Sequence, residues 1–190
     1  MKPFDAVAIG GSAGSFKLVL NLLEVLSQNG GVSLPTLIAL HRSRSLNTGM
    51  LEAFSRKCAH ICEPTDKEPV KKGQVYLAPA NYHMGVEPEK SIFLSTEVAY
   101  HYSRPALDIL FDSASFAYQN RLLTIVLSGA NQDGSWGAAQ VTKRGGTVVV
   151  QDPEEAVIST MPDCALKACQ TDYVLGMAEI KELLVNINQK

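Results

Sequence analysis

The sequence predicts a doubly wound α/β fold, in which a mostly parallel sheet is flanked by helices on both faces and carries an inserted β-hairpin region. Short apolar runs, typical of buried strands, alternate along most of the chain with segments of helical periodicity. Parallel neighbours in a sheet need crossover connections of this kind. Between residues 61 and 96 the helical periodicity stops and prolines interrupt the chain, which indicates a β segment inserted into the α/β pattern.

The composition is that of one globular domain. The 190 residues are 46% hydrophobic and 19% charged, with a formal net charge of −2, which is enough apolar content for a full core. This charge balance provides no basic surface for nucleic acid. The first apolar run is too short for a signal peptide or a membrane span. We therefore expect a single domain over residues 1–190 that is cytoplasmic, binds no nucleic acid and does not insert into a membrane.

The elements before the insertion are two strands, each followed by a helix. Residues 5–10 predict a strand, and the apolar residues of 16–28 fall on one face of a helix that the glycine pair 30–31 ends. Residues 34–40 predict the second buried strand, and residues 45–58 the second helix. Within the insertion, residues 74–79 predict a strand, and residues 83–88 and 91–95 a hairpin that turns through Glu89 and Lys90.

Helical periodicity returns at Ser103, whose hydroxyl is expected to cap a helix that carries Pro105 in its first turn. The remaining expected elements alternate between strand and helix, and Gly145 and Gly146 end the first of these helices. They are a strand at 122–128, a helix at 135–144, a strand at 147–151, a helix at 161–170, a strand at 173–176 and a helix at 178–187.

Three strand ends carry the groups of a nucleophilic hydrolase. In doubly wound sheets the chemistry gathers beyond the carboxyl ends of the strands. Residues 10–14 (GGSAG) end the first strand and fit the G-x-S-x-G pattern of a nucleophile elbow, with Ser12 at its centre. His41 directly follows the second strand, and Asp133 lies in the loop after the strand at 122–128.

These side chains have complementary chemistry. A serine hydroxyl is a weak nucleophile until a histidine takes its proton, and a carboxylate fixes the histidine tautomer and stabilises the imidazolium. Free backbone N–H groups at the start of the helix after Ser12 are suited to stabilise an oxyanion. The candidates for this oxyanion loop are Ala13, Gly129 and Ala130. The residues predict acyl transfer to water.

Other interpretations of the glycine turn fit less well. A dinucleotide site requires G-x-G-x-x-G and an acid after the second strand, but this chain has serine at positions 12 and 15 and His41 after that strand. A Walker A loop requires a Gly-Lys-Ser/Thr ending, which Ser15-Phe16-Lys17 does not provide. We therefore expect no bound cofactor.

The remaining candidate groups each have a structural interpretation. The four cysteines are expected to be reduced thiols, and their spacing matches no familiar zinc site, so we expect no metal. His83 and His101 either line a substrate cleft or are structural. Asp108 and Asp112 lie one helical turn apart, which is typical of a solvated helix face. The cysteines are Cys58, Cys62, Cys164 and Cys169.

Several stretches together resemble the catalytic domain of the chemotaxis protein-glutamate methylesterases, CheB. They are IGGSAGS, the strand-terminal His41, APANYHM, SRPALDILFDSAS, and the long stretch that begins VLSGANQDGSWGA. The resemblance implies an esterase that removes methyl groups from glutamyl methyl esters on chemoreceptor signalling helices, releases methanol and also deamidates selected glutamines. It implies Ser12 as the nucleophile, His41 as the base and Asp133 as the orienting acid, with methyl-accepting chemotaxis receptors as partners.

The sequence departs from this family at positions beside the predicted triad. Ser12-Ala13-Gly14-Ser15 replaces S-T-G-G, Arg42 and Ser43 replace Met-Pro, and Ala130 replaces a methionine. These changes leave two alternatives open, an esterase or amidase for another acyl substrate and a non-catalytic receptor-binding module. The family's enzyme also has an N-terminal receiver domain, whereas this chain begins at the first catalytic strand. We expect either a truncated chain or control by a separate regulatory protein.

Overall fold

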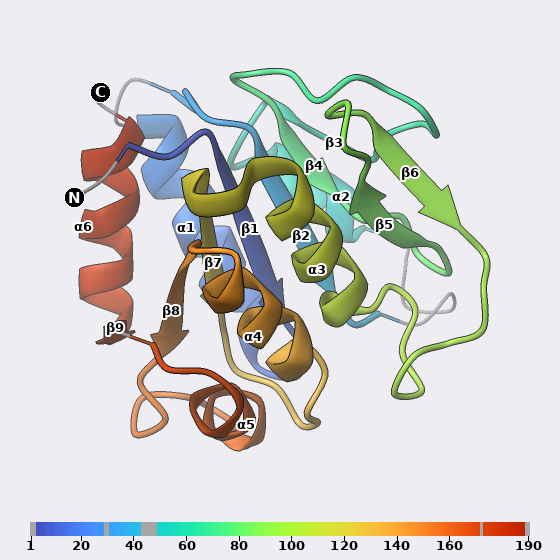
Figure 1. The fold of residues 1–190 in the computed structure, drawn as a ribbon. Helices are drawn as coiled ribbons and strands as arrows, with labels where there is room; N and C mark the ends of the chain where they lie inside the picture. The colour runs from blue at the N-terminus through green and yellow to red at the C-terminus, as the bar shows by residue number, and fades with distance from the viewer. Residues whose placement is uncertain (1–2, 29–30, 43–48, 172, 189–190) are drawn as a thin grey trace.

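A parallel sheet forms the centre of the structure (Figure 1), a computed structural model that describes residues 3–28, 31–42, 49–171 and 173–188. Within this part of the chain the sheet has seven strands in the order β3-β4-β2-β1-β7-β8-β9, and every neighbouring pair is parallel. The strands are β1 (Ala6–Gly11), β2 (Thr36–Leu40), β3 (Ile61–Cys62), β4 (Val75–Leu77), β7 (Leu122–Val126), β8 (Thr147–Gln151) and β9 (Tyr173–Leu175).

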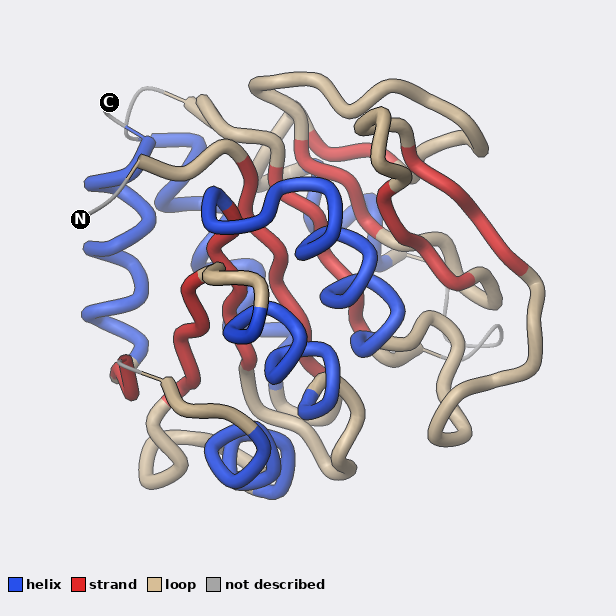
Figure 2. Tube along the Cα trace, in the orientation of Figure 1, coloured by secondary structure: helices blue, strands red, loops and turns tan. Residues whose placement is uncertain are grey.

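Helices cover both faces of this sheet (Figure 2). One face packs against α1 (Ser15–Gln28), α2 (Met50–Ser55) and α6 (Met177–Asn188). The other face packs against α3 (Leu107–Tyr118), α4 (Ser135–Lys143) and α5 (Thr160–Ala168). A short 3₁₀ helix, η2 (Gln119–Arg121), joins α3 to β7. The antiparallel hairpin of β5 (His83–Val86) and β6 (Ile92–Ser95) lies beside α3 on the same side of the sheet.

The central strand shows why the sequence forms this double-sided core. Along β1, Ala6 and Ala8 belong to the apolar cluster under α3 and α4, while Val7 and Ile9 belong to the cluster under α1 and α6. Successive strand residues point to opposite faces, and a strand covered on both faces is therefore apolar at every position. This explains the continuous apolar run that predicted the strand.

The order in which strands are added to the sheet changes side at β1. After β1 the chain crosses over through α1 to β2, and it later returns through α3 to β7 on the other side of β1. Because α1 and α3 lie on opposite faces, the carboxyl ends of β1, β2 and β7 border a topological switch point, where ligands bind in folds of this kind. These ends lie at the lower edge of the sheet in Figure 1.

The predicted fold class, the inserted hairpin and the strand and helix order are confirmed, with differences in detail. The strand expected at 74–79 is β4, which pairs with β2 in the main sheet and is not part of the inserted hairpin. The two-residue strand β3 was not predicted. The helix expected at 45–58 is α2, which spans only Met50–Ser55, and residues 45–48 lie outside the described residues. Gly30, which was expected to end the first helix, also lies outside them. The prediction that Ser103 caps α3 is wrong, because the helix begins at Leu107 and Pro105 precedes it. No helix in the described ranges is long and apolar enough to cross a membrane.

Candidate active site

Ser12 lies in a tight turn between a strand and a helix. β1 ends at Gly11 and α1 begins at Ser15, so three residues make the connection. The N–H of Ser12 donates to the Ser128 carbonyl at 2.9 Å, and the Ser15 hydroxyl donates to the Ser12 carbonyl at 2.5 Å. Because both backbone groups of Ser12 are bonded, the half-buried side chain is held at the end of the central strand.

Small residues on both sides of Ser12 are required by the space around the turn. A Cβ atom added at Gly11 would lie 2.6 Å from the Cβ of Ser15. Gly14 has φ +86°, and a Cβ there would lie 2.7 Å from the Cβ of Val157. Side chains avoid both the positive φ and such short contacts. The geometry is therefore the sharp turn that the G-x-S-x-G pattern predicts.

His41 is placed next to this turn by the pairing of β1 with β2. Gly11 is in register with Leu40, and the N–H of His41 donates to the Gly11 carbonyl at 3.1 Å. The Nε2 atom of its ring lies 2.6 Å from Oδ2 of Asp133. A carboxylate only accepts hydrogen bonds, so this nitrogen carries the proton and the neutral ring has its lone pair on Nδ1.

Asp133 is fully buried and has a second role in addition to its contact with His41. Its Oδ2 atom accepts from the N–H of Leu107 at 2.7 Å, and its Oδ1 atom accepts from the N–H of Asp108 at 3.0 Å. These two N–H groups belong to the first turn of α3 and have no acceptor within the helix, and negative charge is favoured at this end of a helix. Asp133 thus provides the helix cap that was predicted for Ser103.

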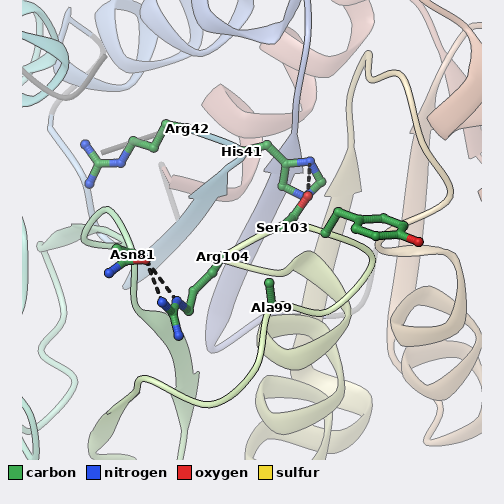
Figure 3. Close-up of a pocket in the computed structure, with 7 residues that line it drawn as sticks. His41, Arg42, Asn81, Ala99, Ser103 and Arg104 are labelled. Carbon is green, nitrogen blue, oxygen red and sulfur yellow. Dashed lines mark hydrogen bonds between the residues drawn. The ribbon is translucent and has the colours of Figure 1, made fainter. Parts of the chain in front are cut away.

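The structure brings the three predicted site residues to neighbouring strand ends, but it joins only two of them directly. His41 contacts Asp133, whereas no hydrogen bond between the described Ser12 and His41 side chains is present. The Nδ1 atom of His41 instead lies 3.2 Å from Oγ of Ser103, as Figure 3 shows. Ser103 was missed as a site residue because a serine before a helical pattern is the usual signal for a cap.

A pocket of ≈ 390 Å³ opens beside His41 and Ser103. Arg42 and Arg104 bring positive charge to its lining. The guanidinium of Arg42 donates to Oε1 of Glu63 at 2.5 Å, and its side chain points away from the His41 ring in Figure 3. Arg104 donates to Oδ1 of Asn81 at 2.7 Å. The lining residues are His41, Arg42, Asn81, Ala99, Tyr102, Ser103 and Arg104.

The three candidates for the oxyanion loop differ in the state of their amides. The N–H of Gly129 donates to the Ile158 carbonyl at 3.1 Å, so this amide is already occupied. Within the described chain, no hydrogen bond occupies the amides of Ala13 and Ala130, which are both exposed. An oxyanion needs unoccupied donors, and of the three candidates Ala13 and Ala130 meet this requirement.

Asp108 is not on a solvated face as predicted, because only 1% of its surface is exposed. Its Oδ1 atom accepts from the N–H of Gly137 at 2.7 Å, and its Oδ2 atom lies 3.8 Å from Nε2 of His101. Burial, together with the negative charge of Asp133, raises the pKa of Asp108 to about 6. The carboxyl therefore lies behind the site as a group that changes charge near pH 6.

The remaining polar candidates have structural positions. His83 is fully buried, its Nδ1 atom accepts from the N–H of Ala106 at 3.2 Å, and burial lowers its pKa. All four cysteines are unpaired, and burial raises the pKa of the Cys58 thiol. Among the described residues, no group of three or more His, Cys, Asp or Glu side chains is placed to hold a metal ion.

Ser12 in a strand-to-helix turn and His41 bonded to the buried Asp133 lie at the switch point of the doubly wound sheet, and serine hydrolases use these three residue types together. The sequence matches the family described as CheB methylesterase over residues 7–184. The chain therefore belongs to the CheB methylesterase family.

Individual relatives agree with this assignment. The chain is 36% identical over 187 residues to a putative protein-glutamate methylesterase/protein-glutamine glutaminase of Leptospira interrogans, covering 98% of this chain and 96% of that protein. It is 32% identical over 181 residues to the Rhodospirillum rubrum protein-glutamate methylesterase/protein-glutamine glutaminase 1, and it spans 46% of that protein. The crystal structure of the Thermotoga maritima CheB methylesterase catalytic domain matches with a TM-score of 0.88 at 28% identity, covering 98% of this chain and 100% of that one.

Proposed function

We propose that this chain is a serine hydrolase that demethylates glutamyl methyl esters on chemoreceptors, with Ser12 as nucleophile, His41 as base and Asp133 as orienting acid. The observation that carries the proposal is the 2.6 Å contact between His41 Nε2 and the buried carboxylate of Asp133, beside the turn that presents Ser12. The names of its relatives supply the substrate class, since they are protein-glutamate methylesterases and protein-glutamine glutaminases.

The reaction follows from the proton positions of the site. Oγ of Ser12 forms a bond to the ester carbonyl carbon while its proton passes to Nδ1 of His41. The bond to the methoxy group then breaks, and that group leaves as methanol with the proton from His41. Water attacks the acyl-enzyme, again losing a proton to His41, and releases the glutamate carboxyl group and free Ser12. With a glutamine side chain, the same steps release ammonia.

The buried carboxylate and the unoccupied amides are placed to stabilise the two charged species of this reaction, the imidazolium of His41 and the oxyanion. Asp133 stabilises the imidazolium that forms when His41 takes the serine proton. The amides of Ala13 and Ala130 are the proposed donors to the oxyanion, and one such donor contributes roughly a hundred- to thousand-fold in rate in other hydrolases. The substrates are cytoplasmic signalling segments of methyl-accepting receptors, and a separate regulatory protein is the proposed means of control.

Methanol release from methylated receptor signalling fragments tests the proposal. We expect the wild-type chain to release methanol and Ser12→Ala to lower kcat by at least about a thousandfold, because the nucleophile is removed. Ser55→Ala, which changes an exposed serine of α2, is the matched control and should retain the wild-type rate. Equal rates for wild type and Ser12→Ala would remove Ser12 from the mechanism. A folded wild-type chain that releases neither methanol nor ammonia would favour another acyl substrate or a binding module.

A further inference from the structure

We propose that the Ser103 hydroxyl competes with Ser12 for the basic nitrogen of His41: it occupies Nδ1 in the substrate-free protein and has to release it before Ser12 can react. This inference rests on the proposed function, since it assumes that His41 is the base for Ser12. It starts from the two ring nitrogens of His41, each of which already has a partner: Asp133 at Nε2 and Ser103 at Nδ1.

The direction of the second hydrogen bond follows from the first. With the proton on Nε2 facing the Asp133 carboxylate, Nδ1 carries the lone pair, so the Ser103 hydroxyl is the donor across the 3.2 Å to Nδ1. This lone pair is also the acceptor that Ser12 needs in order to lose its proton. The hydroxyl groups of Ser12 and Ser103 therefore compete for Nδ1 of His41, and in this structure Ser103 is hydrogen-bonded to it.

Ser103 has a second acceptor to which its hydroxyl can turn when it releases Nδ1. Its Oγ atom lies 3.4 Å from the His101 carbonyl, which offers a second acceptor for the hydroxyl proton. When Ser12 takes Nδ1 of His41, the hydroxyl proton of Ser103 turns to the His101 carbonyl. The Ser103 hydroxyl therefore releases the nitrogen by rotating about its own C–O bond and keeps an acceptor when it does so.

The backbone turn that carries Ser103 is built to hold this position. The N–H of Tyr100 donates to the Ser103 carbonyl at 3.1 Å, and the N–H of Ser103 donates to the Tyr100 carbonyl at 2.9 Å. The two central residues of this turn, His101 and Tyr102, have φ +48° and +62°. Positive φ at residues other than glycine is unfavourable and persists where the surrounding structure imposes it.

The segment that follows this turn imposes it. Arg104 donates from Nη1 to the carbonyls of Thr96 at 2.5 Å and Glu97 at 2.7 Å. It also donates from Nη2 to Oδ1 of Asn81, as Figure 3 shows. Two other parts of the chain, at Asn81 and at Thr96 and Glu97, thus meet at the guanidinium next to Ser103. These contacts hold the backbone of Ser103, so the bond to His41 requires the ordering of only its one side-chain torsion.

The other charged and titratable groups near the ring set the conditions for any test that varies pH. Asp133 contacts the ring directly, and Asp108 lies behind Asp133. Arg42 and Arg104 line the same pocket, and His101 is in the turn that carries Ser103. Among the described residues, the charged and titratable groups around the site include Arg42, Glu63, His83, His101, Tyr102, Arg104, Asp108 and Asp133.

The test compares Ser103→Ala with two control variants. One keeps a hydroxyl at position 103, and the other removes a hydroxyl elsewhere and leaves Ser103 unchanged. Ser103→Thr retains a hydroxyl at this site, and Ser55→Ala removes an exposed hydroxyl of α2 that bonds the Glu52 carbonyl and does not contact His41. Long-range proton–nitrogen spectra of ¹⁵N-histidine-labelled protein report the Nδ1 resonance of His41, identified by its loss in His41→Asn. Methanol release from the methylated receptor fragment gives kcat/KM for the same variants.

We expect the Nδ1 resonance of Ser103→Ala to move towards that of an imine nitrogen without a hydrogen bond, and to remain near wild type in the other two variants. We expect kcat/KM of Ser103→Ala to rise about 2- to 10-fold, the range that corresponds to loss of one competing hydrogen bond. An unchanged Nδ1 resonance, or a kcat/KM at or below wild type, would overturn the proposal. If wild type releases no methanol, the proposed function fails, while the resonance still decides whether Ser103 occupies the nitrogen.

Discussion

At the scale of single residues, the charge state of Asp108 links the site to the stability of the protein. Its carboxyl is buried beside Asp133, and its Oδ2 atom has no hydrogen-bond partner among the described atoms. Burial raises its pKa from 3.8 to about 6. Above pH 6 the native protein therefore holds a buried negative charge next to another carboxylate, which is unfavourable in a region of low dielectric.

We predict that Asp108→Asn removes a pH-dependent loss of stability. Between about pH 4 and 6 the unfolded chain has lost this proton and the native protein keeps it, so the free energy of unfolding falls as pH rises through this interval. The shift corresponds to at most about 3 kcal/mol. Asparagine keeps the oxygen that accepts from the Gly137 N–H but cannot ionise. Urea unfolding from pH 4.5 to 7.5 should show that the free energy of unfolding of the variant rises relative to that of wild type as pH increases. A difference between the two that does not depend on pH would contradict this.

Ser103 and Asp133 show at the same scale how residue type and residue position differ. Serine at the start of a helical pattern predicts a cap, yet the donors of the first turn of α3 are bonded by Asp133 from another loop. A helix cap requires only an acceptor near the first N–H groups, and a distant residue satisfies it equally well. The hydroxyl of Ser103 is consequently free to bond His41.

At the scale of elements, the connection between β1 and α1 fixes the position of Ser12. Gly14 takes positive φ in a crowded place, where the Cβ of Val157 and the Oγ of Ser128 would lie 2.7 and 2.8 Å from an added Cβ. Ser128 in turn donates from Oγ to the Ala13 carbonyl at 2.8 Å. The turn is therefore tied to the loop after β7, which also carries Asp133.

Substitution of two glycines that have the same φ separates crowding from backbone strain. Gly14 and Gly31 both have φ +86°, but an added Cβ at Gly31 has no atom within 4 Å. We predict that Gly31→Ala costs about 1–2 kcal/mol from the left-handed backbone alone. Gly14→Ala should cost about 1–3 kcal/mol more from overpacking and should also lower kcat by displacing Ser12. Denaturant titrations of both variants measure the difference, and equal destabilisation would mean that the turn relaxes around the new methyl group.

At the scale of the whole molecule, one sheet connects both apolar clusters. β1 contributes Ala8 to the cluster under α3 and Ile9 to the cluster under α1, and β7 contributes Val126 and Ile125 in the same way. A defect on one face is therefore transmitted through shared strands to the other face. This coupling is the basis for treating residues 1–190 as a single catalytic domain, which we propose.

We predict that the chain unfolds in a single cooperative transition. Far-ultraviolet circular dichroism reports the helices on both faces, and the fluorescence of the single tryptophan, Trp136 in α4, reports one face beside the site. Both probes should give the same midpoint in urea, as expected for a two-state domain. Two separate midpoints would show that part of the chain unfolds independently and would contradict the single-domain proposal.

The sequence by itself determined the fold class, because an apolar strand buried on two faces and an amphipathic helix leave different periods in the chain. It also placed Ser12, His41 and Asp133 at strand ends, since the carboxyl ends of parallel strands share one edge. The tertiary structure alone decided which of these groups touch. The pairing of His41 with Asp133 and Ser103 depends on three loops that are distant in sequence, and on buried hydrogen bonds that no local pattern encodes.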